Sequence, residues 1–141
     1  MRVQKRGDNS HDWELYRGAG RIGIEWYFQQ TTTLPTSVMM YRLEPGAEEG
    51  QHHHLGGDPE SCSPGSSDEM YIVTRGEVVI TAGADRRTLR VGDAFYAPEG
   101  MHHGVRNESD AVAELVLVFG PRGPHPFPQT GAEAFDAEAE R

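Results

Sequence analysis

Short runs of β-branched and aromatic residues recur along the chain, and glycine and proline separate them. This punctuation is typical of an all-β domain, because short strands are bounded by turn-forming residues. The pattern indicates no long amphipathic helix. The runs predict strands at residues 21–29, 37–43, 51–54, 69–74, 77–81, 87–91, 94–97, 103–107 and 111–119.

Tight turns between the predicted strands indicate how the strands pair. Arg75 and Gly76 separate the runs 69–74 and 77–81, and residues 82–86 separate the next two runs. Both segments have the length and composition of hairpin turns, so we expect successive strands to be antiparallel neighbours. Many short strands at this spacing favour a sandwich or a barrel.

The length of the chain predicts a single domain over residues 1–141, with its core within about residues 20–120. Residues 121–141 have the composition of a proline-rich strap followed by an acidic tail. Residues 55–68 are rich in turn formers and make the one long loop of the prediction. A loop of this length in a compact domain is typically a lid or a binding loop, so we expect it to close over the mouth of the barrel.

Charge and cysteine content disfavour several classes of partner. The 13 basic and 22 acidic residues give a formal charge of −9, whereas affinity for nucleic acid depends on clustered lysine and arginine. No apolar run reaches the roughly 20 residues of a membrane span, and the N-terminus lacks the apolar segment of a secretory signal. We therefore expect a cytoplasmic protein with no nucleic-acid or membrane partner. The single cysteine, Cys62, is expected to be exposed and inert.

Three of the seven histidines are consecutive: His52, His53 and His54. In a β-strand alternate side chains share a face, so His52 and His54 point together while His53 points away. Two imidazoles on one face can bind one metal ion. Further ligands must come from other strands, and Glu69 and His103 each stand where turn sequence passes into a predicted strand.

These residues resemble the two sequence motifs of the cupin superfamily. The first motif, G-x5-H-x-H-x(3 or 4)-E-x6-G, is matched by Gly46, His52, His54, Glu69 and Gly76. The second, G-x5-P-x-G-x2-H-x3-N, is matched by Gly92, Pro98, Gly100, His103 and Asn107. The resemblance implies an antiparallel double-stranded β-helix, a jelly-roll-like barrel. It also implies one metal ion, with His52, His54, Glu69 and His103 as its ligands.

The first motif departs from the family pattern between His54 and Glu69. Residues 55–68 lie there, where the motif allows only three or four residues, so the long loop interrupts the motif. Asp58 keeps the short spacing and is the alternative oxygen ligand. We favour Glu69, because it opens a strand that reaches Gly76 in the expected register, whereas Asp58 precedes a proline in the loop.

Imidazole and carboxylate ligands suit a divalent first-row metal. We expect zinc or iron, with manganese, nickel and copper as alternatives. Tyr71 lies two residues after Glu69 in the same predicted strand, so both side chains point to the same face. We expect Tyr71 to line the cavity, either as a packing residue or as a catalytic residue together with Glu69. His53 and His102 are expected outside the ligand set, at the surface or behind the ligands.

The resemblance implies a small metal-dependent enzyme with its metal at the base of an apolar cavity. The chain is similar to cupins that act on aromatic or polyketide-type substrates, so we expect a small organic substrate that is cyclised through its carbonyl groups. An Fe(II) dioxygenase of enolic or phenolic substrates is the alternative.

Two further alternatives are a non-catalytic small-molecule-binding cupin and an isomerase. An isomerase of anionic substrates should present several basic residues to the cavity, and only Arg42 and Arg106 are candidates on strands. Cupins commonly dimerise by exchanging edge strands, a role that residues 21–29 could fill, so we expect a homodimer.

Overall fold

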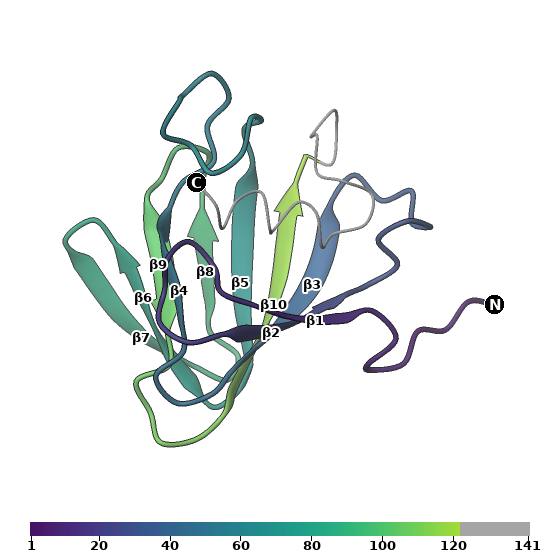
Figure 1. Cartoon of the computed structure of the whole chain (residues 1–141), viewed down its shortest axis with the longest axis horizontal. Helices are drawn as coiled ribbons and strands as arrows, with labels where there is room; N and C mark the ends of the chain where they lie inside the picture. The colour runs from purple at the N-terminus through teal and green to yellow at the C-terminus, as the bar shows by residue number, and fades with distance from the viewer. Residues whose placement is uncertain (122–141) are drawn as a thin grey trace.

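The computed structural model describes residues 1–121, which contain ten β-strands and no helix (Figure 1). The strands are β1 (Ser10–Trp13), β2 (Ile22–Trp26), β3 (Ser37–Leu43), β4 (Glu48–His52), β5 (Asp68–Arg75), β6 (Glu77–Ala82), β7 (Asp85–Arg90), β8 (Ala94–Ala97), β9 (His103–Arg106) and β10 (Ala113–Gly120). Each predicted run corresponds to one of β2–β10, and β1 is an additional strand.

The strands form two antiparallel sheets. One sheet has six strands in the order β1-β2-β3-β10-β5-β8, and the other has four in the order β4-β9-β6-β7. In Figure 1 the four-stranded sheet lies on the left and the larger sheet in the centre and on the right. The all-β, antiparallel fold class predicted from the sequence is therefore confirmed.

One of the two predicted hairpins is wrong. Residues 82–86 do form a hairpin, since β6 pairs with β7 over its whole length. At Arg75 and Gly76, however, the chain leaves the larger sheet, because β5 pairs with β8 and β10 while β6 belongs to the other sheet. Gly76 has a φ of 68°, and a Cβ atom there would lie 2.6 Å from the carbonyl oxygen of Val112. The glycine therefore makes a corner between the sheets that a larger residue would not fit.

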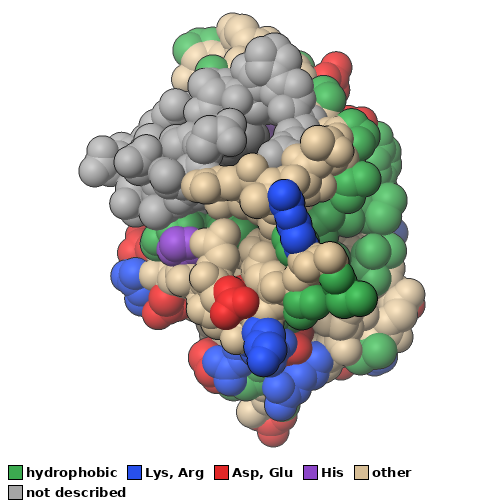
Figure 2. Space-filling view, turned by 90° about the vertical axis from the view of Figure 1, so that its right-hand side faces the viewer, with side chains coloured by type: hydrophobic (Ala, Val, Ile, Leu, Met, Phe, Trp, Pro, Cys, Tyr) green, Lys and Arg blue, Asp and Glu red, His purple; other side chains and the backbone are tan. Residues whose placement is uncertain are grey.

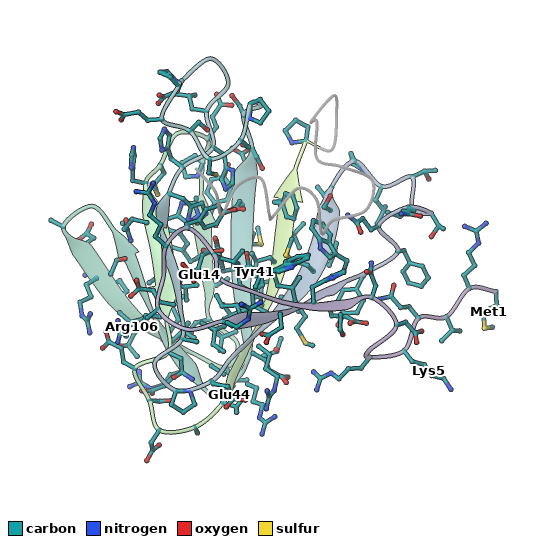
Figure 3. The ribbon with its side chains drawn as sticks, in the orientation of Figure 1. Met1, Lys5, Glu14, Tyr41, Glu44 and Arg106 are labelled. Carbon is teal, nitrogen blue, oxygen red and sulfur yellow. The ribbon has the colours of Figure 1, made fainter. Side chains whose placement is uncertain are left out.

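The hydrophobic core fills the space between the sheets. Val73 and Leu115 come from the larger sheet, and Val105 comes from the smaller one. Met39 is an inward residue of β3, because it is buried together with Tyr41 and Leu43, whereas Met40 is only half-buried. Tyr41, from the same face of β3, points into the interior (Figure 3). The core therefore contains the hydroxyl of Tyr41 as well as apolar side chains.

The surface and strand edges bear on the predicted partners. On the face shown in Figure 2, basic and acidic side chains lie intermixed toward the lower end. No helix in the described part of the chain is long and apolar enough to span a bilayer.

The strand suggested for dimer exchange, β2, is already paired with β1 and β3, so β1 is the edge of this sheet. Of the predicted strap and tail over residues 121–141, all but Pro121 lies outside the described residues.

Candidate metal centre

The structure brings the four predicted ligands together in the interior. They come from the end of β4, the residues just after it, the start of β5 and the start of β9: His52, His54, Glu69 and His103. All four are buried, and one ligand atom from each lies within 4.8 Å of the other three. The Glu69 carboxylate is at the centre of the group: its Oε1 is 3.2 Å from Nε2 of His54, and its Oε2 is 2.7 Å from Nε2 of His103.

The pairing of β4 with β9 explains why the cluster forms. His52 and His103 are directly opposite each other in the register of this antiparallel pair. Cross-strand neighbours on one face have Cβ atoms only about 5 Å apart. Glu69 comes from the opposite sheet, so the site spans the gap between the two sheets.

The imidazole of His52 shows that the residues fit a metal ion. Its Nε2 atom is buried and has no hydrogen-bond partner among the described residues. The nearest carboxylate oxygens, on Glu69 and Glu49, are 3.7 and 3.9 Å away. A buried polar atom without a partner costs free energy, so it calls for an explanation such as an absent ion. A divalent metal bound by the cluster would satisfy this atom.

Contacts at Nδ1, the other ring nitrogen, hold each of the three imidazoles in the orientation that metal binding requires. Nδ1 of His52 donates to the carbonyl oxygen of Gly50 at 2.8 Å, and Nδ1 of His103 donates to that of Met101 at 2.8 Å. Nδ1 of His54 lies 3.1 Å from Oγ of Ser63. Protonation of Nδ1 leaves the Nε2 lone pair free for a metal, as is common at metal-binding histidines.

Electrostatics keep the central carboxylate ionised. Burial alone raises the pKa of Glu69, but the charge of His54 and the hydrogen bond from His103 outweigh it and hold the pKa well below its usual value. Burial lowers the pKa of His103, and the hydrogen bond and charge of Glu69 more than reverse this, so that pKa is raised. The site therefore contains a permanent anion that attracts a cation.

Tyr71 lies beside the ligands, and it connects them to a second buried carboxylate. Its hydroxyl is 2.9 Å from Oε2 of Glu69, 3.0 Å from Nε2 of His103 and 2.8 Å from Oε1 of Glu49. Oε2 of Glu49 accepts a further hydrogen bond from Tyr41 at 2.7 Å. Burial, and then the charge of Glu49, raise the pKa of Tyr71 well above its usual value, so its hydroxyl stays protonated at neutral pH.

Glu49 was not predicted from the sequence. Alternation counted back from His52 places Gly50 inward and Glu49 outward. In the structure the register of β4 and β9 shifts between Glu49 and His52, and this irregularity turns both side chains inward. The side chain of Glu49 is 1% exposed. The only trace of it in the sequence is an acidic residue three positions before His52.

The second histidine of the run and the loop aspartate pair with each other. Nε2 of His53 is 2.7 Å from Oδ2 of Asp58, and the ring of His53 stacks on that of His102 with centroids 4.0 Å apart. All three residues lie outside the ligand cluster. Asp58 therefore fixes the loop to His53, while Glu69 lies within the cluster.

We expect the substitution Asp58→Asn to leave the metal content of the purified protein unchanged. The carboxylate pairs with the His53 ring and accepts a hydrogen bond from the backbone N–H of Glu60, and both partners lie outside the ligand cluster. The amide oxygen of asparagine can still accept one of these hydrogen bonds. Plasma mass spectrometry of tag-free wild type and variant measures the outcome. A loss of metal in this variant would mean that the loop aspartate, and not Glu69, is the oxygen ligand.

The expectation that Cys62 is exposed and inert was wrong about its exposure. Cys62 is buried, and its Sγ lies 3.1 Å from Nδ1 of His54. Its backbone N–H donates to the carbonyl oxygen of His53 at 3.1 Å. Turn-forming composition predicts a surface loop, but the backbone of residues 61–63 packs behind the ligands. The loop, at the top of Figure 1, thus supports His54 from behind.

A half-open cleft of about 660 Å³ reaches His52 from the outside. Its walls include Tyr16, Ser61 and His102, and polar side chains predominate. This lining differs from the apolar cavity expected from the sequence. Val73, Val105 and Phe119 belong to the packed hydrophobic core.

Comparison with known proteins agrees with the fold and the site. The family model described as the cupin domain matches residues 39–119, more than half of the chain and all four clustered residues. A protein of Streptomyces coelicolor, uncharacterised SCO3923, is 30% identical over 95 residues, which cover 67% of this chain and 79% of that protein. Protein SchB of Streptomyces halstedii is 29% identical over 84 residues, 60% of this chain, and the match spans only 54% of SchB.

Among solved structures, a predicted oxalate decarboxylase from Thermotoga maritima has a similar fold. Its TM-score is 0.70 at 19% sequence identity, over 84% of this chain and 97% of the other. At this identity the likeness concerns the fold alone.

Proposed function

The chain belongs to the cupin family, and on this basis we propose that it is a metal-dependent enzyme that cyclises a small polyketide-type substrate through its carbonyl groups. The observation that carries the proposal is the buried cluster of three imidazoles around one carboxylate, with the unpartnered Nε2 atom of His52. Zinc or iron is the proposed metal. The Tyr71 hydroxyl beside the cluster supplies a group that can exchange hydrogen bonds with a substrate.

Each residue has a role in this proposal. When bound, a divalent metal held by His52, His54, Glu69 and His103 supplies a Lewis acid that polarises a carbonyl oxygen. Tyr71 stays protonated, and in the free protein its one hydroxyl proton lies within hydrogen-bond distance of Glu49 and Glu69. On substrate binding this proton would turn from Glu49 to the substrate oxygen on which enolate charge develops. Tyr41 donates to the other oxygen of Glu49 and holds that carboxylate in place. Glu69, ionised and central, is the second residue that we assign to catalysis.

Two observations bear on the alternatives. The side chains of Arg42 and Arg106 are exposed and pair with Glu44 and Glu48, so neither supports binding of an anionic sugar in the interior. Glu44 and Arg106, which Figure 3 labels, lie toward the lower end of the molecule in that view. An Fe(II) dioxygenase would use the same ligands, and a non-catalytic binding protein would use only the cleft. A homodimer in the cytoplasm is proposed with the enzyme.

The proposal is tested with metal-loaded protein and a linear aryl triketone as the probe. Metal content is measured first by plasma mass spectrometry. Cyclisation followed by aromatisation removes one water from the probe, which mass spectrometry of the product detects. Oxygen uptake with incorporation of oxygen would replace the cyclase by the dioxygenase. Bound metal with an unchanged probe would favour the binding protein, and absence of metal would overturn the proposal.

The substitution Tyr71→Phe is expected to retain the metal but lower turnover by about 100-fold, the lower end of what a positioned proton-donating group contributes. The ring keeps its packing, and only the hydroxyl is removed. Loss of this donor to buried Glu49 should also cost about 1–2 kcal/mol of unfolding free energy. Turnover and urea unfolding are measured on the same preparations. Unchanged turnover would remove Tyr71 from the mechanism.

A further inference from the structure

An N-terminal segment, residues 14–20, packs directly against the strand that carries His52. The backbone N–H of Gly50 donates to the carbonyl oxygen of Leu15 at 3.0 Å, and that of Glu48 donates to Ala19 at 2.8 Å. Leu15 is buried and forms an isolated parallel bridge with Glu49. In Figure 1 this segment is the purple loop that crosses β4. It lies outside residues 39–119, the part that matches the cupin family.

Two glycines allow this close approach. A Cβ atom on Gly18 would lie 2.0 Å from the carbonyl oxygen of Glu48. A Cβ atom on Gly50 would lie 1.9 Å from that of Tyr16. Both distances are far below van der Waals contact, so the two backbones touch only because neither position has a side chain.

This packing places an aromatic ring on a proposed metal ligand. The Tyr16 ring stacks on the His52 ring with centroids 3.9 Å apart and planes inclined by 15°. Tyr16 and Arg17 have φ values of 51° and 59°, a left-handed conformation that residues with side chains rarely adopt. Such conformations persist where the surrounding structure fixes them, and they concentrate at functional sites.

We propose that Tyr16 is a positioning residue of the metal centre. The hydrogen bond from Nδ1 of His52 to the carbonyl oxygen of Gly50 fixes one edge of the imidazole ring. The ring can still turn about the line of this hydrogen bond. The flat contact with Tyr16 fixes the plane of the ring, and hence the direction of the unpartnered Nε2 atom. Tyr16 and His52 also share the wall of the cleft, so the segment borders the cleft where it meets the cluster. The inference rests on the metal site of the proposed function, and it is independent of the reaction.

The test compares Co(II) binding by four forms of the full chain: wild type, Tyr16→Ala, Tyr16→Phe and Glu14→Ala. Co(II) is chosen because its visible absorption reports the geometry of its ligands, and competition with a chelator gives the dissociation constant. Tyr16→Phe keeps the stacked ring. Glu14, labelled in Figure 3, is an exposed neighbour in the same segment and serves as the matched control.

Tyr16→Ala is expected to weaken Co(II) binding by about three- to tenfold and to alter the visible spectrum, since a stacked aromatic contact contributes on this scale. Tyr16→Phe and Glu14→Ala should match the wild type in both measurements. Wild-type affinity and spectrum in Tyr16→Ala would overturn the positioning role. Weaker Co(II) binding by Tyr16→Phe with an unchanged spectrum would also overturn the positioning role, because that result would assign the effect to the hydroxyl. Failure of the wild type to bind Co(II) would instead overturn the metal site.

Discussion

Replacement of Glu69 by glutamine is expected to remove stoichiometric metal while leaving the fold in place. Glutamine has nearly the same shape, but it lacks the charge that the three imidazoles surround. The loss of a group that only orients a ligand costs about 10–100-fold in affinity, so loss of this direct, charged ligand should exceed about 100-fold. Plasma mass spectrometry and chelator competition with Zn(II) measure the change.

Thermal unfolding gives an independent measure of the same effect. A ligand at 100 times its dissociation constant stabilises the native state by about 2.7 kcal/mol, which for a domain of this size corresponds to roughly 8–12 °C in Tm. Wild type should show this rise on addition of Zn(II), and Glu69→Gln should not. Glu60→Gln, an exposed carboxylate in the loop, is the control and should behave as wild type. Full metal content in Glu69→Gln would mean that Glu69 is not a ligand.

Much of the fold was predictable because it follows from local patterns. Runs of β-branched and aromatic residues correctly located β2–β10, and the predicted bounds of β3 and β8 agree with the structure at both ends. The four clustered residues were predictable because turn glycines and ligand spacing together resembled the cupin motifs. Glu69 could be chosen over Asp58 because it opens a strand, and the structure places it among the histidines.

The features that were missed depend on departures from regular geometry or on contacts distant in sequence. The inward position of Glu49 results from a register shift, which strict alternation cannot represent. Cys62 is buried because the loop backbone bonds to His53, although its composition is that of a surface loop. The stacking of Tyr16 on His52 joins residues 36 positions apart (52 − 16), and no local pattern encodes it. The sequence therefore predicted the four clustered residues and Tyr71 beside them, but not the positions of Glu49, Cys62 and Tyr16.

Substitution of Gly50 by alanine is expected to destabilise the protein by about 2–4 kcal/mol, as overpacking of a rigid contact does. The added Cβ atom would lie 1.9 Å from the backbone oxygen of Tyr16, and a backbone oxygen cannot turn aside as a flexible side chain can. The N-terminal segment must then move away from β4 and lose the hydrogen bond between Gly50 and Leu15. Urea unfolding of the metal-free protein measures the loss.

Gly23→Ala is the matched control, because Gly23 is also a strand glycine in an ordinary backbone conformation. A Cβ atom there would lie 3.5 Å from the Cβ atom and 3.7 Å from the backbone oxygen of Arg42, and both are ordinary van der Waals contacts. Its unfolding free energy should stay within about 1 kcal/mol of wild type, because alanine mainly reduces the entropy of the unfolded chain. If Gly50→Ala were as stable as this control, the segment would not be packed on β4. If it is destabilised and also binds Co(II) more weakly, the packing of the segment and the orientation of His52 are coupled.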